Sequence, residues 1–169
     1  MAIREIVTVP SPVLRRKAHP VTKFDEELQV LITDMIETMR TAPGVGLAAP
    51  QVGISQRVIV VEYTTDEEVE TAPKNLYAVV NPEIKVTSEE AELGVEGCLS
   101  VPGLLGEVER NLKISIKGLN RLGQPTRIKA QGWLARIFLH EVDHLEGVIF
   151  TDLASTIWKP EVDDYVDKV

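Results

Sequence analysis

The strongest hydrophobic pattern in the chain is a helical one near the N-terminus. Apolar residues recur there at intervals of three and four positions: Leu28, Leu31, Ile32, Met35 and Met39. This spacing places them on one face of a helix. Asp25 is suited to cap the start of that helix, and Pro43 marks the point before which it should end. The pattern therefore predicts an amphipathic helix that begins after Asp25.

The middle of the chain shows the period of two that is typical of strands. Apolar and polar residues alternate over residues 112–117 and 126–130, on either side of a turn at residues 120–123. Three further segments are rich in residues that favour strands: 57–62, 76–81 and 83–87. We expect the glycine-punctuated segment 44–53 and the acidic segment 64–74 to be loops.

A second helix is predicted over residues 132–145, which include the apolar residues Trp133, Leu134, Ile137, Phe138 and Leu145. Strands joined by hairpins and followed by a helix indicate an α+β fold. The chain has 169 residues, about the length of one domain, so we expect a single domain over residues 1–169.

Composition and charge narrow the function classes. Hydrophobic residues make up 44% of the chain, and no apolar run approaches the roughly 20 residues of a membrane span. The net charge of −8 argues against general binding to nucleic acid, DNA included, or to anionic lipid. The N-terminus lacks the pattern of a secretory signal, and the lone Cys98 cannot form an internal disulfide. We therefore expect a cytoplasmic protein without a membrane partner.

The second predicted helix carries a metal-binding motif. Residues 140–144 read HEVDH and match H-E-x-x-H, so His140 and His144 lie on one helical face and can bind one ion. Glu141 can then reach a water molecule on the metal instead of the metal itself. The alternative is an amphipathic helix whose histidines face solvent or a polar core.

A catalytic metal of this kind usually takes three protein ligands and leaves one position open. Phe150 stands where a longer version of the motif would supply a third histidine. The remaining candidates are the thiol of Cys98 and the carboxylate of Asp164, which lies in an acidic segment near the chain end. A metal bound by Cys98, His140 and His144 also accounts for the lone thiol.

Three segments together resemble the signature of the peptide deformylases. They are 44–51 (GVGLAAPQ), 96–100 (EGCLS) and 140–147 (HEVDHLEG), in the family's order and at similar separations. The resemblance is strongest over residues 3–152, so residues 153–169 are predicted to form a short acidic tail.

The resemblance implies a fold in which antiparallel sheets wrap around a central metal-binding helix, with the N-terminal helix packed outside. It implies one Fe²⁺ per chain, bound by Cys98, His140 and His144, for which Zn²⁺, Ni²⁺ or Co²⁺ can substitute. The implied reaction is hydrolysis of the N-terminal formyl group of formyl-methionyl nascent peptides, which releases formate.

The resemblance also implies roles for individual residues. Metal-bound water is the nucleophile, with Glu141 as general acid and base. The Gln51 amide and the Leu99 backbone N–H donate to the oxyanion. Gly44 and Gly46 let the loop that contains them lie alongside an extended peptide.

Further residues are implied around this site. Those that match the pocket for the methionine side chain are Val45, Trp133 and Ile137. Glu96 and Arg110 match a structural ion pair behind the site. The acidic tail lacks the basic helix with which some bacterial relatives dock on ribosomal RNA, so the mode of any transient ribosome contact is left open.

Two other functions stay open from the residues alone. One is a zinc endopeptidase that uses His140, His144 and a downstream carboxylate. The other is a structural metal domain without catalysis, which would need a fourth protein ligand and would leave Gln51 and the glycine loop without a role.

Overall fold

The computed structural model describes residues 2–161 of the chain, and more of them belong to strands than to helices. The strands are β1 Gly46–Ala48, β2 Val58–Thr64, β3 Lys74–Val86, β4 Ala91–Cys98, β5 Val101–Asn111, β6 Lys113–Leu119, β7 Pro125–Gln131 and β8 Thr156–Trp158. The helices are α1 Glu26–Thr41, α2 Gly132–Leu145 and α3 Phe150–Leu153, with short 3₁₀ helices η1 Pro12–Arg15 and η2 Ala49–Val52.

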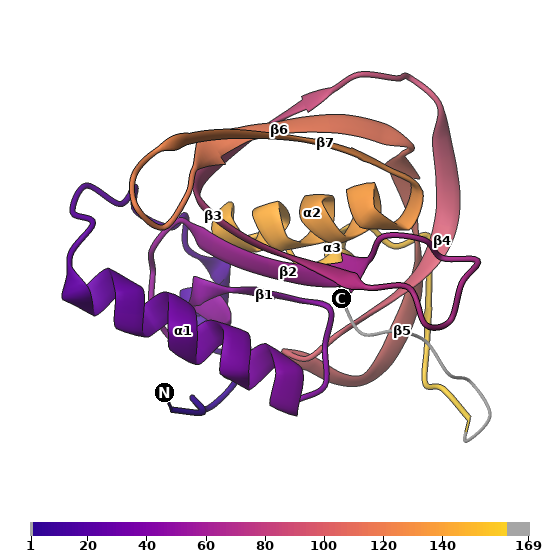
Figure 1. The fold of residues 1–169 in the computed structure, drawn as a ribbon. Helices are drawn as coiled ribbons and strands as arrows, with labels where there is room; N and C mark the ends of the chain where they lie inside the picture. The colour runs from indigo at the N-terminus through magenta and orange to yellow at the C-terminus, as the bar shows by residue number, and fades with distance from the viewer. Residues whose placement is uncertain (1, 162–169) are drawn as a thin grey trace.

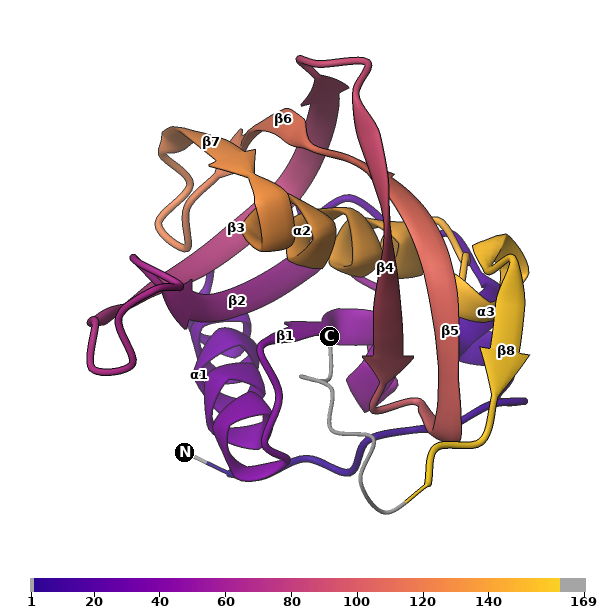
Figure 2. The ribbon, with the colours of Figure 1, turned by 90° about the vertical axis from the view of Figure 1, so that its right-hand side faces the viewer.

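The strands form two antiparallel sheets (Figures 1 and 2). The larger has five strands in the order β1-β2-β3-β6-β7, and the smaller has three in the order β4-β5-β8. All of the strand pairings are antiparallel. Antiparallel sheets with few helices confirm the predicted α+β class.

Helix α1 has the ends that the sequence predicts. The Asp25 carboxylate accepts a hydrogen bond from the Leu28 backbone N–H at 3.1 Å, which satisfies one of the free donors of the first turn. The helix ends at Thr41, ahead of Pro43. The five apolar residues of its predicted stripe are all buried, and the helix packs against β1 and β2.

Strand β2 is buried on both faces. Val58 and Val60 belong to the hydrophobic cluster that contains the apolar face of α1. Ile59 and Val61 belong to a second cluster, which contains residues of α2. The two helices therefore cover opposite faces of this part of the sheet, which explains why β2 is a continuous apolar run without alternation.

Helix α2 has the predicted bounds and contacts strands of both sheets, including β1, β2, β7 and β5 (Figure 2). A third hydrophobic cluster joins the smaller sheet to the segments around it and contains Cys98, Val101, Val108, Ile149 and Phe150. The HExxH motif thus lies where the interiors of the two sheets meet.

Two predicted boundaries in the larger sheet are wrong. The segment 44–53, predicted as a loop, contains β1 and η2; β1 has three residues, and its pairing with β2 is a long-range contact that no local pattern reveals. The two predicted strands 76–81 and 83–87 are one strand, β3, with an irregularity near Asn81. Asn81 has a φ of 52°, and its side chain bonds the backbone of Val21 at 2.8 and 2.9 Å.

Strands β4 and β5 were not predicted, and neither was β8. Glycines and buried charged residues, Glu96 and Arg110 among them, interrupt the alternation of β4 and β5. Strand β8 pairs with β5, so part of the predicted tail 153–169 belongs to a sheet. Residues 162–169, which include Asp164, lie outside the described residues.

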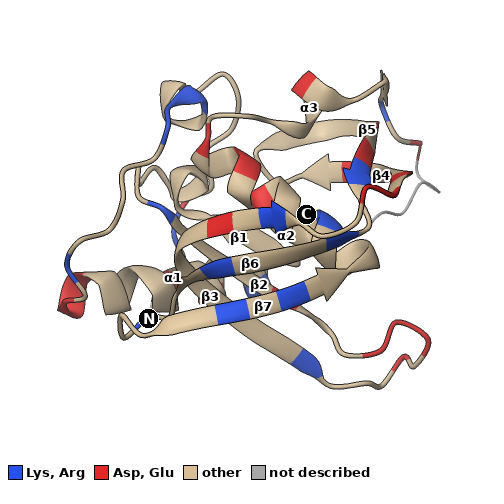
Figure 3. Ribbon diagram, turned by 90° about the horizontal axis from the view of Figure 1, so that it is seen from above, with Lys and Arg blue, Asp and Glu red and all other residues tan. Residues whose placement is uncertain are grey.

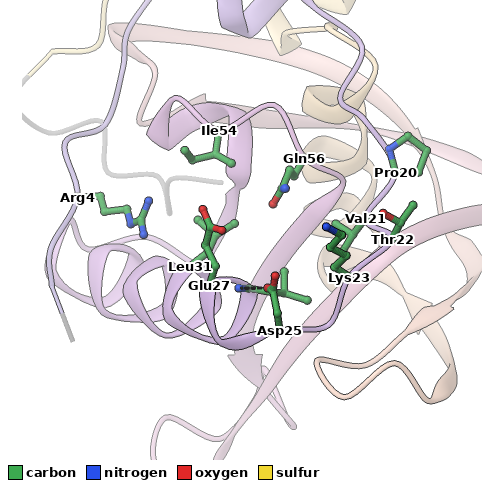
Figure 4. Close-up of a pocket in the computed structure, with 11 residues that line it drawn as sticks. Arg4, Pro20, Val21, Thr22, Lys23, Asp25, Glu27, Leu31, Ile54 and Gln56 are labelled. Atoms are coloured by element: carbon green, nitrogen blue, oxygen red, sulfur yellow. Dashed lines mark hydrogen bonds between the residues drawn. The ribbon is translucent and has the colours of Figure 1, made fainter.

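A cavity of about 280 Å³ lies between the N-terminal segment and the start of α1 (Figure 4). The charged residues Arg4, Lys23, Asp25 and Glu27 line it, together with apolar residues of α1. None of the residues predicted for the site lines this cavity. Among residues 2–161, no helix combines the length and apolar composition that crossing a membrane requires.

The packing of α1 generates a stability prediction. Ile32 has no exposed surface, whereas Val30 on the same helix is 46% exposed. We expect Ile32→Ala to lower the free energy of unfolding by about 2–5 kcal/mol and Val30→Ala to change it by less than about 0.5 kcal/mol. Urea denaturation of both variants measures the difference, and equal losses would contradict the assigned face of α1.

Candidate metal centre

Three side chains from distant parts of the chain converge in the interior. Cys98 is the last residue of β4, and His140 and His144 lie one turn apart on α2. One ligand atom from each lies within 4.8 Å of the other two, and the Cys98 Sγ is 3.4 Å from His144 Nε2. Donor atoms that share one tetrahedral ion lie about 3–4 Å apart. The structure thus brings together the three residues that the sequence suggests as ligands.

The hydrogen bonding around these residues fits a bound cation. His140 Nε2, His144 Nδ1 and both carboxylate oxygens of Glu141 are buried and have no hydrogen-bond partner among the described residues. Buried polar atoms without partners are rare and costly in proteins. A metal would supply the missing partner of His140 Nε2, and water beside it would supply those of Glu141, whereas the His144 nitrogen that faces Cys98 is Nε2 and not the unpartnered Nδ1.

The Cys98 thiol needs a cation to become a ligand. Burial, followed by the nearby Glu141 carboxylate, raises the pKa of this thiol to about 12. Only the thiolate binds a metal well, and a coordinating cation deprotonates a thiol outright. The site is therefore suited to a thiolate only when an ion is present.

Glu96 fixes the orientation of His140. The His140 Nδ1 lies 2.8 Å from Glu96 Oε1, and Arg110 donates to both oxygens at 2.9 and 3.0 Å. Burial acts to raise the pKa of Glu96, but these hydrogen bonds outweigh it and lower the pKa to about 2. An ionised carboxylate only accepts, so Nδ1 carries the proton and leaves Nε2 free for a metal. The predicted ion pair between Glu96 and Arg110 is confirmed.

Arg136 is a part of this network that the sequence did not suggest. Its Nη1 donates to Glu96 Oε2 at 2.7 Å and to the Val108 carbonyl at 2.7 Å, and its Nη2 donates to the Glu92 carbonyl at 2.8 Å. The residue is only 5% exposed. A Cβ on Gly94 would lie 2.6 Å from the Arg136 Cζ, so a glycine in β4 makes room for the guanidinium.

Glu141 is close to the backbone of β1. A Cβ on Gly46 would overlap Glu141 Oε2 and lie 2.9 Å from its Cδ, so only glycine allows this approach. Burial, followed by the charge of Glu96, raises the pKa of Glu141 well above its usual range. A carboxyl with a raised pKa beside a metal centre is suited to take up and release protons.

Gln51 presents its amide nitrogen to the site. Its Oε1 accepts from the Ala48 backbone N–H at 3.0 Å, which leaves Nε2 to donate to Ser100 Oγ at 3.1 Å and toward Cys98 Sγ at 3.5 Å. Both Gln51 and Ser100 are fully buried. Ser100, which the sequence did not single out, thus holds the amide next to the candidate ligand Cys98.

The other predicted residues lie around this centre. Leu99 is in the turn between β4 and β5, and a Cβ on Gly44 would lie 3.0 Å from its Cδ1. Val45, Trp133 and Ile137 belong to one hydrophobic cluster, and Ile137 has no exposed surface. Trp133 also lines a cavity of about 300 Å³ beside Arg136, which Val45 and Ile137 do not line.

The chain is similar to known proteins over most of its length. The family model described as polypeptide deformylase matches residues 3–159. A peptide deformylase of Natranaerobius thermophilus is 48% identical over 161 residues, which cover 95% of this chain and 98% of that protein. The crystal structure of peptide deformylase from Thermotoga maritima is 46% identical with a TM-score of 0.82, covering 92% of this chain and 100% of that one. A Met-Ala-Ser bound peptide deformylase from Acinetobacter baumannii is 39% identical with a TM-score of 0.82, covering 90% and 98%.

The contact between Gly46 and Glu141 can be tested by stability. Gly46→Ala should lower the free energy of unfolding by about 1–3 kcal/mol, because the new methyl group overlaps the carboxyl group. The same substitution in a Glu141→Ala background should cost less, since the overlapping atoms are gone. Gly44→Ala is the control, because the nearest atom to its methyl group is the Cδ1 at the end of the Leu99 side chain, at 3.0 Å. Equal costs of Gly46→Ala in both backgrounds would show that Glu141 is not the obstacle.

The Arg136 contacts generate a prediction on metal affinity. Arg136→Met should weaken the binding of Zn²⁺ or Ni²⁺ by about 10- to 100-fold, because Glu96 then holds His140 less firmly. Competition with a chelating indicator measures this affinity. The control is Arg40→Met, which removes an arginine whose side chain is 50% exposed and pairs with Glu62. Unchanged affinity in Arg136→Met would contradict the positioning role.

Proposed function

Because the chain belongs to the polypeptide deformylase family, whose members remove N-formyl groups, we propose that it hydrolyses the formyl group of peptides that begin with formyl-methionine. One observation carries the proposal: a buried cluster of Cys98, His140 and His144 lies beside a buried carboxyl group that has no partner among residues 2–161. The products are formate and a peptide with a free amino terminus.

Cys98, His140 and His144 would hold the metal, which we propose to be Fe²⁺ in the cell, with Zn²⁺, Ni²⁺ or Co²⁺ as substitutes. Thiolate and imidazole ligands suit all of these ions. When bound, such an ion polarises the formyl oxygen and lowers the pKa of a water molecule, so that a nucleophile is available near neutral pH.

Glu141 is the proposed proton carrier. Its carboxyl group takes the proton of the attacking water at one oxygen and gives it to the nitrogen of the leaving amine. The pKa raised by burial suits both steps, because the group can hold a proton between them. Gly46 keeps the nearest backbone of β1 free of a side chain that would displace this carboxyl group.

Gln51 and Leu99 are the proposed donors to the formyl oxygen. Gln51 Nε2 already points toward Cys98, held by Ser100 and by the Ala48 backbone. The Leu99 backbone N–H belongs to the turn directly after Cys98. Preorganised donors of this kind stabilise negative charge as it develops on oxygen.

Strands β1 and β4 each end a sheet, and among residues 2–161 no strand pairs with the outer edge of either, so an extended peptide could add there. We propose that the peptide backbone lies there, alongside Gly44 and Gly46. Val45, Trp133 and Ile137 would receive the methionine side chain. The relative that binds Met-Ala-Ser supports a ligand with methionine first.

The alternatives receive less support. The protease hypothesis needs a downstream carboxylate ligand, and its candidate Asp164 lies outside the described residues. The structural-metal hypothesis needs a fourth ligand, whereas the cluster in the described part of the chain has three. The relatives described above are bacterial, and we propose that the chain acts in the cytoplasm on nascent peptides.

The proposed roles predict that two substitutions abolish activity in different ways, one with the metal retained and one with the metal lost. Glu141→Gln should retain the metal and lose about 10²–10⁴-fold in turnover, because it removes proton transfer and leaves the ligands in place. Cys98→Ala should lose tightly bound metal and activity together. Formate release from a formyl-methionyl tripeptide, with metal content determined on the same samples, measures both. Full metal retention by Cys98→Ala, or full activity of Glu141→Gln, would contradict the assignment.

A further inference from the structure

Positive charge gathers on one face of the larger sheet, although the chain as a whole is acidic. Figure 3 shows basic residues side by side on β6 and β7. Five exposed cations form this patch, which we name the basic sheet face. One lies on β3, two on β6 and two on β7: Lys85, Lys113, Lys117, Arg127 and Lys129. One carboxylate, Glu83, lies among them.

The strand register places these side chains on the outer surface. Lys117 pairs directly with Arg127 and with Glu83, and Ser115 pairs with Lys85 and Lys129. The alternate residues of β6, Ile114 and Ile116, are buried in the cluster that contains α2. Because side chains alternate between the two faces of a strand, the basic sheet face points away from α2.

One cross-strand pair of this face is unfavourable. Like charges directly opposite each other in a sheet are destabilising, and Lys117 faces Arg127 in this way, with Glu83 on its other side. None of the salt bridges within residues 2–161 includes any of the five cations. The face carries a formal charge of +4, so the rest of the chain carries −12 to give the total of −8.

Protection of an exposed sheet edge explains only part of this pattern. Lysine and arginine on an edge strand prevent pairing with other chains. That reason applies to Arg127 and Lys129 on β7, which ends the sheet. It does not apply to Lys85, Lys113 and Lys117, because β3 and β6 are interior strands.

The shape and chemistry of the face suit a phosphate backbone. Neighbouring strands lie about 4.8 Å apart and alternate residues about 6.8 Å apart, so the charges cover roughly 10 by 14 Å. Within the basic sheet face, Lys113, Ser115 and Lys129 line a hollow of about 410 Å³. The outward positions of the basic sheet face carry no aromatic residue on which a base could stack. Recognition would therefore depend on phosphates and on duplex shape, not on unpaired bases.

We propose that the basic sheet face docks the chain on the phosphate backbone of double-stranded RNA. The choice of RNA rests on the proposed function, because nascent peptides are made on particles built largely of folded RNA. Docking through this face leaves the candidate metal centre free, since α2 and its ligands lie on the other side of the sheet. The surrounding negative charge keeps the contact weak and reversible.

The test is a salt titration with a matched control. Fluorescence anisotropy of a labelled 20-base-pair RNA duplex gives the affinity from 25 to 200 mM NaCl. The logarithm of the affinity should fall linearly with the logarithm of the salt concentration, with a slope of about −3.6 to −4.5, as for four or five phosphate contacts. Lys117→Gln/Lys129→Gln should reduce the magnitude of this slope by about 2 and the affinity at 50 mM by at least tenfold.

The control is Lys17→Gln/Lys159→Gln, which makes the same change in net charge at two exposed lysines outside the larger sheet. It should leave the slope unchanged and the affinity within about twofold. Equal effects of the two double variants would overturn the proposal. The proposal would also be overturned if the protein bound phosphatidylglycerol vesicles, or a DNA duplex of the same sequence, more tightly than the RNA duplex at equal salt. Self-association in sedimentation velocity that depends on Lys117 and Lys129 would instead identify a second copy of the chain as the occupant.

Formate release from a formyl-methionyl tripeptide is measured in parallel. Both double variants should match the unmodified protein, because neither touches the candidate metal centre. Failure of the unmodified protein to release formate would overturn the proposed function, whereas the anisotropy titration judges the RNA contact independently.

Discussion

Glu96 has no exposed surface, and a carboxylate is stable in such a place only when charged and hydrogen-bonding partners are buried with it. Its partners are Arg110 from β5, and Arg136 and His140 from α2. The native packing is therefore stable only when strands β4 and β5 and the HExxH helix α2 meet at Glu96. Removing one member of such a network leaves an uncompensated buried charge, at a typical cost of about 3–5 kcal/mol.

The same requirement prepares the candidate metal centre. Because the ionised Glu96 accepts from His140 Nδ1, the tautomer and the ring orientation of this histidine are set before any ion arrives. The hydrophobic cluster around Cys98 keeps its thiol out of water, and the approach of Gly46 keeps Glu141 beside the centre. Structural stability and readiness for chemistry thus depend on the same buried contacts.

Sequence reasoning succeeded where local patterns carry the information. The periodicity of α1 and α2, the Asp25 cap of α1, the alternation of β6 and β7, and the spacing of His140 and His144 are all local. It failed for β4 and β5, because they place Glu96 and Arg110 where a sheet interior normally has apolar residues. Their partner Arg136 was missed for a related reason, since an arginine between apolar residues of a helix suggests solvent exposure and not burial. The HExxH spacing alone did not identify Cys98 as a candidate, because its position against α2 depends on the hairpin of β4 and β5.

The place that Gly94 provides for Arg136 has a consequence for how this site can change in evolution. A side chain at position 94 and a guanidinium at position 136 compete for the same volume, so position 94 cannot gain a side chain while Arg136 stays. A lineage that gives up the arginine for an apolar residue regains space in β4 and can fill it with a larger side chain. The reverse change must begin with a small residue at position 94, because arginine cannot enter first. These two positions should therefore vary together among related chains, although they lie 42 positions apart in the sequence.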